Sequence, residues 1–287
     1  MPRIKGNDKI ERLQRQLSSW IEFLENNLEE AIEKGMPPNL IAIAFFDLAL
    51  GKLAANEIDT AKGLFFQGTN SLIENKEIKS NISFIDYYAE RKYAIYAYLG
   101  GNRELARPLA IRLISEFNLR RARIPTPYLS PPEKNFENLY LIMDNLILDK
   151  SNEVKILIDN LDKKLSKFKI SGSLYNKSGL YNKYSFFGKE MVKALFIKDE
   201  EQFSKNADHW SNLALNVLSL HDTSKALVSP ELILLHDLAL DNGLRPKIVS
   251  PFIPKTILDH GYWNQQRYSQ FAFDVLFRCR FLLRSRW

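Results

Sequence analysis

The apolar residues of the first forty positions recur at steps of three and four. This spacing places them on one face of a helix. It predicts a single long helix that is capped by Asn7 or Asp8 and stopped by Gly35, before Pro37 and Pro38. The apolar stripe consists of Ile10, Leu13, Leu17, Trp20, Ile21, Leu24, Leu28 and Ile32.

The same helical period returns along the rest of the chain, in segments separated by short polar turns. Further helices are predicted over 39–55, 59–74, 84–99, 104–117, 136–148, 154–168, 186–197, 201–220, 230–241 and 264–283. Gly100, Gly101 and Asn102 are predicted to form one of the turns. Short turns between helices of this length make successive helices antiparallel. Because strand-like alternation is nearly absent, we expect an all-α stack of antiparallel helical hairpins with about ten or eleven helices.

Three longer polar or proline-rich stretches are predicted to be loops. They cover residues 75–81, 118–132 and 171–183. Long loops in compact domains are either connectors or functional segments. We therefore expect a single all-α domain over the whole chain. The third loop is the place where it would divide into 1–170 and 184–287.

Two of the predicted hairpins resemble tetratricopeptide repeats. The residues that carry the resemblance are Ala49, Gly51 and Ala61 in one hairpin, and Tyr98, Leu99, Gly100, Asn102 and Ala106 in the other. Small residues at such positions let paired helices approach closely. The hairpins do not keep the strict period of about 34 residues, so a helical-hairpin stack is expected instead of a true repeat array.

Composition and charge narrow the class of protein further. With 45% hydrophobic and 26% charged residues, the chain has the composition of a folded domain. The net charge of +6 favours acidic partners, but no aromatic or glycine-rich motif indicates nucleic-acid binding. The basic amphipathic segment 264–283 is expected to cover the end of the stack, not to bind a membrane. One cysteine, Cys279, and the lack of a signal peptide point to the cytoplasm.

One group of residues could carry chemistry, because all four histidines are adjacent to an aspartate. The pairs are Asp208–His209, His221–Asp222, His236–Asp237 and Asp259–His260. Helical phosphohydrolases of the HD superfamily bind a divalent metal through a histidine, a His-Asp pair and a distant aspartate. The corresponding ligands here would be His209, His236, Asp237, and either Asp259 or Asp274, holding a metal that activates water.

Capping and surface roles explain these pairs more simply, because adjacent residues of a helix point about 100° apart. No glycine-rich phosphate loop, paired-cysteine motif, zinc-protease motif or nucleophile elbow occurs in the chain. We therefore predict no catalytic residue and no cofactor.

Tyrosines and acidic residues are the predicted contact surface for a partner. Tyrosines 87, 88, 93, 96 and 98 lie so close together that several should fall off the buried stripe, and exposed tyrosine is typical of protein interfaces. The first helix adds a run of glutamates. The predicted partner-binding residues are Glu25, Glu29, Tyr87, Tyr88, Tyr93 and Tyr128.

The C-terminal third carries a more specific resemblance. The runs ALFIKDEEQFSKNADHW and SPELILLHDLALDNGLRPKIVSPFIPKTIL contain a small-acidic turn at Lys198 and Asp199, an alanine-containing helix ending at Gly243, and the segment SPFIP at 250–254. In these features the chain resembles the immunity protein 49 family, the all-α immunity proteins of bacterial polymorphic toxin systems. The resemblance implies a protein that binds a cognate toxin and blocks it, with no catalytic residues of its own.

The predicted function is therefore that of a non-catalytic protein-binding module, in the first place an immunity protein. Two alternatives stay open at this stage. One is a helical-repeat adaptor that binds a peptide or protein in a concave groove. The other is the metal-dependent phosphohydrolase of HD type described above.

Overall fold

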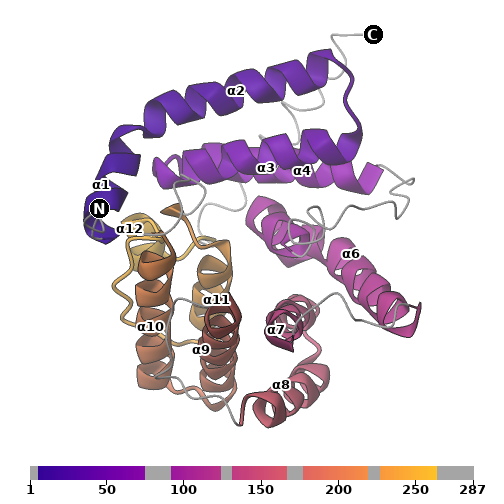
Figure 1. Ribbon diagram of the computed structural model, residues 1–287, viewed down its shortest axis with the longest axis vertical. Coiled ribbons are helices and arrows are strands. Elements are labelled where there is room, and N and C mark those ends of the chain that lie inside the picture. The colour runs from indigo at the N-terminus through magenta and orange to yellow at the C-terminus, as the bar shows by residue number, and fades with distance from the viewer. Residues whose placement is uncertain (1–5, 75–91, 124–130, 167–176, 219–226, 264–287) are drawn as a thin grey trace.

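The computed structural model describes residues 6–74, 92–123, 131–166, 177–218 and 227–263 (Figure 1). These ranges contain eleven helices and no strand, which confirms the predicted all-α stack. The helices are α1 (Gly6–Arg15), α2 (Leu17–Glu33), α3 (Pro38–Ala54), α4 (Ile58–Glu74), α6 (Tyr93–Arg123), α7 (Pro131–Ile147), α8 (Ser151–Leu165), α9 (Lys177–Ile197), α10 (Glu200–Leu218), α11 (Pro230–Asp241) and α12 (Lys255–His260).

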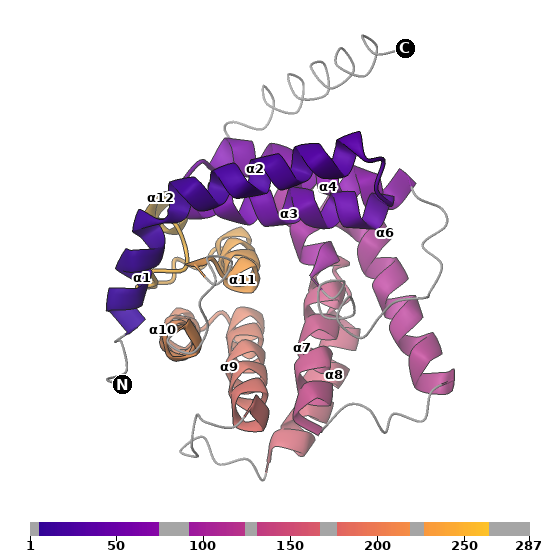
Figure 2. The ribbon, with the colours of Figure 1, turned by 45° about the horizontal axis from the view of Figure 1, so that its top comes forward.

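The helices form a long upper layer and two groups beneath it. Helices α2, α3 and α4 lie side by side across one end of the molecule, with α6 to α8 under one half and α9 to α12 under the other (Figures 1 and 2). The main hydrophobic core contains residues of every helix from α3 to α11 that the structure describes. Helices α7 and α8 both contact α9, so the described residues up to 166 and from 177 onward share one core.

Five helix ends use the same left-handed turn. Positive φ angles of 55° to 82° occur at Gly35, Asn56, Asp149, Lys198 and Gly243. In each case the next residue donates its N–H to the carbonyl five positions back, as in Lys150 to Asn145 and Leu244 to Ala239. This arrangement satisfies the carbonyls at the end of the helix and reverses the chain. It confirms the turns predicted at these positions and explains why successive helices are antiparallel.

The predicted first helix is in fact two helices that join at Gln16. Ile10 and Leu13 of α1 pack against Leu227 and Phe252 in the C-terminal half, and α1 lies against α10. The stripe of α2 packs instead on α3 and contains Leu17, Ile21, Leu24 and Leu28. The unbroken steps of three and four could not reveal the break, because it arises from two different packing partners.

The turn predicted at Gly100, Gly101 and Asn102 does not exist, because α6 runs without interruption from Tyr93 to Arg123. Gly100 lies where α6 crosses α4. A Cβ atom at this position would lie 2.5 Å from the backbone nitrogen of Phe66 and 2.7 Å from the carbonyl carbon of Phe65. The glycine therefore allows two helix backbones to touch and does not reverse the chain. Gly51 of α3 instead makes room for side chains of α2, with Trp20 Cζ3 3.1 Å from a Cβ built there.

Several predicted boundaries also differ. Residues 118–123, 131–132 and 177–183 were expected in loops and belong to α6, α7 and α9. The short helix α12 was not predicted. The predicted loop 75–81 and helix 264–283 lie outside the described residues. None of the described helices is both long and apolar enough to cross a membrane.

An extended segment, residues 244–250, runs along α10, and we call it the strap. Side chains one turn apart on α10 accept hydrogen bonds from alternate backbone amides of the strap. The bonds are Arg245 N–H to Glu200 Oε2 (2.6 Å), Lys247 N–H to Ser204 Oγ (3.0 Å) and Val249 N–H to Asp208 Oδ1 (3.2 Å). Four helical residues advance about 6 Å and two extended residues about 6.6 Å, so the two periods match.

The close contact at Gly100 generates the first prediction. Gly100→Ala should lower the free energy of unfolding by about 1–3 kcal/mol, because the added methyl group meets backbone that cannot move aside. Gly63→Ala is the matched control in α4, where a Cβ atom meets nothing within 4 Å. There the substitution should raise the free energy of unfolding by roughly 0.5–1 kcal/mol. Denaturant unfolding of both variants tests the pair, and equal effects would show that the crossing is looser than described.

Candidate functional site

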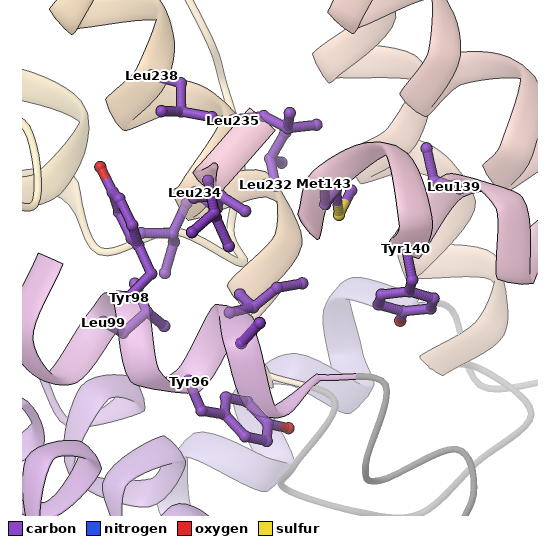
Figure 3. Packing of buried hydrophobic residues seen from close by; sticks show 14 of the residues in the cluster. Tyr96, Tyr98, Leu99, Leu139, Tyr140, Met143, Leu232, Leu234, Leu235 and Leu238 are labelled. Carbon is purple, nitrogen blue, oxygen red and sulfur yellow. The ribbon is translucent and has the colours of Figure 1, made fainter. Parts of the chain in front are cut away.

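Helix α11 is the most buried helix in the described part of the chain, and its polar side chains form the candidate site. Every residue from Pro230 to Ala239 is buried. Figure 3 shows the leucines of α11 among Tyr98 and Leu99 of α6 and Met143 of α7. Glu231, His236 and Asp237 are nevertheless ionisable. Because a buried charge is unfavourable unless it is paired, the surroundings of these three residues determine what they can do.

Asp237 accepts hydrogen bonds from three groups. The Tyr98 hydroxyl donates to Oδ2 at 2.6 Å, and the backbone N–H groups of Tyr262 and Trp263 donate to Oδ1 at 3.1 and 3.3 Å. Burial raises the pKa of Asp237, although these hydrogen bonds oppose the rise. Burial and the neighbouring carboxylate also raise the pKa of Tyr98.

The two aromatic residues after α12 make return contacts to α6. The Tyr262 hydroxyl donates to the carbonyl of Leu99 at 2.9 Å, and Trp263 Nε1 donates to the carbonyl of Tyr98 at 3.1 Å. The ammonium group of Lys62 lies 5.0 and 4.8 Å from the two ring centroids, within cation–π range. Asp237 is therefore a junction between α11, α6 and residues 262–263.

Glu231 is the centre of a second buried group. Its Oε1 atom accepts a hydrogen bond from the Tyr140 hydroxyl at 2.7 Å and pairs with Lys92 at 2.8 Å. Ser229 lies beside its other oxygen and accepts a hydrogen bond from Trp210 Nε1 at 3.1 Å. Burial alone would raise the pKa of Glu231, but the Lys92 charge and the hydrogen bonds hold it below its usual value.

His236 differs from both carboxylates, because neither of its ring nitrogens has a hydrogen-bond partner among the described residues. Its side chain is fully buried. Burial lowers its pKa from 6.5 to about 4, so the imidazole is neutral near pH 7. An unpaired buried imidazole lowers the stability of the fold.

The proposed metal ligands are not brought together. His209 is exposed and stacks on Phe187 with ring centroids 5.1 Å apart, and Asp259 is exposed on α12. Asp237 is engaged by Tyr98, Tyr262 and Trp263, as described above. No three histidine, cysteine or acidic side chains form a metal-binding group within the described ranges. His221, Asp222 and Asp274 lie outside those ranges.

The predicted partner-binding residues are placed unevenly. Tyr87, Tyr88 and Tyr128 lie outside the described residues. The expectation of exposed tyrosine is wrong for Tyr93, which is 7% exposed with its ring 5.6 Å from that of Phe46. Tyr96 and Tyr98 are also buried, because α4 and α11 both pack on this end of α6.

The two predicted glutamates of α2 do lie at the surface. Glu29 is exposed. Glu25 is half-exposed and pairs with Lys52 of α3 at 2.9 Å. The prediction that these residues contact a partner is thus compatible with their positions.

Two surface pockets are large enough for a small molecule. A pocket of about 410 Å³ has an apolar wall that includes Leu195 and Leu238, and a rim containing Arg103, Asp149 and Asp241. A second, of about 570 Å³, lies between Gln14 of α1 and the segment that leads into α12, and Asp259 is the one proposed metal ligand that lines it. Neither pocket is lined by Glu231, His236 or Asp237.

Sequence reasoning missed Glu231 and Lys92, and it did not connect Tyr98 with Asp237. Glu231 could have been noticed, because it is the lone acid in the otherwise apolar stretch before His236. Its partners come from α6 and α7, about 90 to 140 residues away in the chain. The sequence around Glu231 gives no sign of these distant partners.

Comparisons with known proteins add no relative. No protein-family model matches the chain, and neither a curated protein nor a solved structure matches it.

The buried imidazole generates the second prediction. The unfolded chain takes up a proton at His236 near pH 6.5, whereas the folded chain does so only near pH 4. Stability should therefore fall by about 3 kcal/mol as the pH drops from about 7.5 to below 4. His236→Leu should remove this part of the pH dependence, measured by urea unfolding at a series of pH values.

Comparison at each pH isolates the effect of His236. Burial raises the pKa of Glu137 to about 7, which acts in the opposite direction, so parent and variant must be compared at each pH. If His236→Leu unfolds with the parental pH dependence, the neutral buried imidazole is ruled out.

Proposed function

We propose that this protein acts by binding another protein, as an immunity protein that neutralises a cognate toxin. The observation that supports the proposal best is the outer face of α2. This helix packs on α3 through one apolar stripe and presents the opposite face to solvent. Although the chain as a whole has a net charge of +6, α2 carries five glutamates and no basic residue.

The acidic face of α2 also contains apolar anchors. Glu22, Glu29, Glu30 and Glu33 are exposed there. Phe23 and Ile32, at the two margins of this face, are 58% and 49% exposed. A large exposed aromatic side chain bordered by charge is the pattern of an interaction hot spot with a polar rim.

The chemistry of the surface defines the partner. A face with four exposed carboxylates attracts a basic protein surface, and charge of this kind mainly raises the rate of association. Enzymes that act on nucleic acids or other phosphates have basic clefts. A toxin of that class would suit α2, and the positive charge elsewhere on the chain would confine the contact to this helix.

The resemblance of residues 194–210 and 229–258 to the immunity protein 49 family supports the same proposal from another part of the chain. In the structure these residues form the end of α9, the first part of α10, α11, the strap and most of α12. They hold the stack together around Asp237 and leave α2 free to bind. A rigid scaffold that holds a preformed binding helix suits a stoichiometric inhibitor.

The third prediction tests this surface. The tagged full-length protein should retain one near-stoichiometric partner from source-cell extract, and that partner should be toxic when expressed alone. The double variant Phe23→Ser/Glu29→Lys should bind it at least about 30-fold more weakly and lose protection, because it removes the anchor and reverses a charge. Binding is measured by calorimetry and protection by growth on co-expression.

A matched control lies on α8, where Ile156 is 61% exposed and Asp159 is also exposed. Ile156→Ser/Asp159→Lys makes the same chemical change on another helix and should bind the partner like the parent. Equal binding by both double variants would show that α2 is not the contact surface. Several weakly held ligands in place of one toxic partner would favour an adaptor over an immunity protein.

A further inference from the structure

The pocket of about 410 Å³ lies where the ends of α7, α9 and α11 meet the start of α8, beside α6. Its volume is within the range of about 300–1,000 Å³ that small-molecule sites occupy. The apolar wall comes from the last turns of α7, α9 and α11. It consists of Leu146, Leu195, Phe196 and Leu238. A branched or aromatic apolar group of a ligand therefore has a surface on which to pack.

Two charged groups at the rim of this pocket are already paired with each other. Arg103 of α6 forms an ion pair with one oxygen of Asp149. Arg107 pairs with the second oxygen of the same carboxylate at 2.9 Å. Because both oxygens of Asp149 are engaged and Arg103 is held by one of them, these groups maintain the rim and leave the recognition of a charged ligand to other residues.

Two other charged groups of the rim have no partner. The side chains of Asp241 and Lys150 are exposed, and neither forms a hydrogen bond or an ion pair within the described ranges. Ser151, which also lines the pocket, is exposed beside Lys150. The rim therefore offers one free carboxylate and one free ammonium group next to the apolar wall.

Both free charges lie at helix ends that disfavour them. Asp241 is the last residue of α11, where the helix dipole favours a cation and the last turn has no basic residue. Lys150 is the N-cap of α8, where the dipole favours an anion and no side chain caps the first amides. Partial burial raises the pKa of Asp241, Arg103 opposes the rise and the Asp149 charge adds to it. A cation beside Asp241 and an anion beside Lys150 would each remove an unfavourable interaction.

We propose that this pocket binds a free amino acid with a branched or aromatic apolar side chain. The ammonium group of the ligand pairs with Asp241 at the end of α11. Its carboxylate lies beside Lys150, the Ser151 hydroxyl and the first amides of α8, and its side chain packs on the apolar wall. An amine or an acid alone would use only one of the two free charges, so a zwitterion complements the rim better than either.

This site is separate from the acidic face of α2, because no residue of α2 lines the pocket. The inference goes beyond the proposed inhibition of a toxin and does not depend on it. The double variant Phe23→Ser/Glu29→Lys should bind the amino acid like the parent, so the two proposals fail separately.

The fourth prediction uses L-leucine and L-phenylalanine as probes of the full-length protein. At least one of them should bind in calorimetry with a dissociation constant at or below about 1 mM. The corresponding amines, isoamylamine and phenethylamine, lack the carboxylate, and the corresponding acids, isocaproate and hydrocinnamate, lack the ammonium group. The amine and the acid should each bind at least about 10-fold more weakly than the amino acid, because one charge of the rim is then left without a partner.

Two charge variants assign the two ends of the ligand. Asp241→Asn should weaken binding of the amino acid at least about 10-fold and remove its advantage over the acid. Lys150→Gln should weaken it in the same way and remove its advantage over the amine. Neither change should lower the denaturation midpoint, because each removes a charge from a helix end that disfavours it.

Matched controls make the same chemical changes outside the pocket. Asp159→Asn and Lys163→Gln alter exposed residues of α8 that do not line it, and both variants should bind the amino acid like the parent. The proposal is overturned if neither amino acid binds at about 1 mM, if the amine or the acid binds as tightly as the amino acid, or if Asp241→Asn keeps the parental affinity.

Discussion

The carboxylate of Asp237 is the interaction on which the arrangement of the described helices depends most. It accepts hydrogen bonds from a side chain of α6 and from two backbone amides that follow α12. A buried carboxylate with three donors is stable in an apolar core, whereas the same group without them would have to take up a proton or draw in water. Asp237 therefore joins α11 to α6, which crosses α4. It also joins α11 to residues 262 and 263, which follow the strap and α12.

The segment from the strap to Trp263 is attached at two places, to α10 at its start and to Asp237 of α11 at its end. Glu200, Ser204 and Asp208 of α10 hold the strap by its backbone, and the chain then passes through α12 to Tyr262 and Trp263. Glu231, six residues before Asp237, joins the other end of α11 to Tyr140 of α7 and to Lys92, which directly precedes α6. The most buried helix is thus held at both ends by polar contacts and along its length by leucines. The outer face of α2 lies away from these contacts and is exposed.

The buried and the exposed polar groups have different roles in this protein. Glu231 and Asp237 of α11 are hydrogen-bonded to their neighbours, whereas His236 has no hydrogen-bond partner among the described residues. The hydrogen-bonded carboxylates stabilise the fold, and the unpaired imidazole lowers its stability. The glutamates of α2 and the cations of the strap instead face solvent, where their charge can be felt by an approaching molecule. The two surfaces differ in the sign of their charge.

Periodicity and turn chemistry were enough to predict the class of fold. Apolar steps of three and four determine a helix wherever it packs, and residues such as Gly35, Asn56 and Gly243 end helices through local backbone preferences alone. The predicted span of α11 was correct at both ends, because Pro230 and Asn242–Gly243 are local signals. Glu29 could likewise be predicted to lie at the surface, because it lies opposite the apolar stripe of α2.

Tertiary structure decided the rest, because it depends on which helix meets which. Gly100 has the local signature of a turn, but α4 approaches so closely there that only glycine fits within a continuous helix. The position of Tyr93 off the apolar stripe of its helix predicted an exposed side chain. A second helix packs on that face and buries it. The His-Asp pairs looked alike in sequence, whereas packing made His236 and Asp237 core residues and left His209 in solvent. Local sequence determines the conformation of a segment, but contacts between distant segments determine which of its polar groups are buried, paired or free to bind.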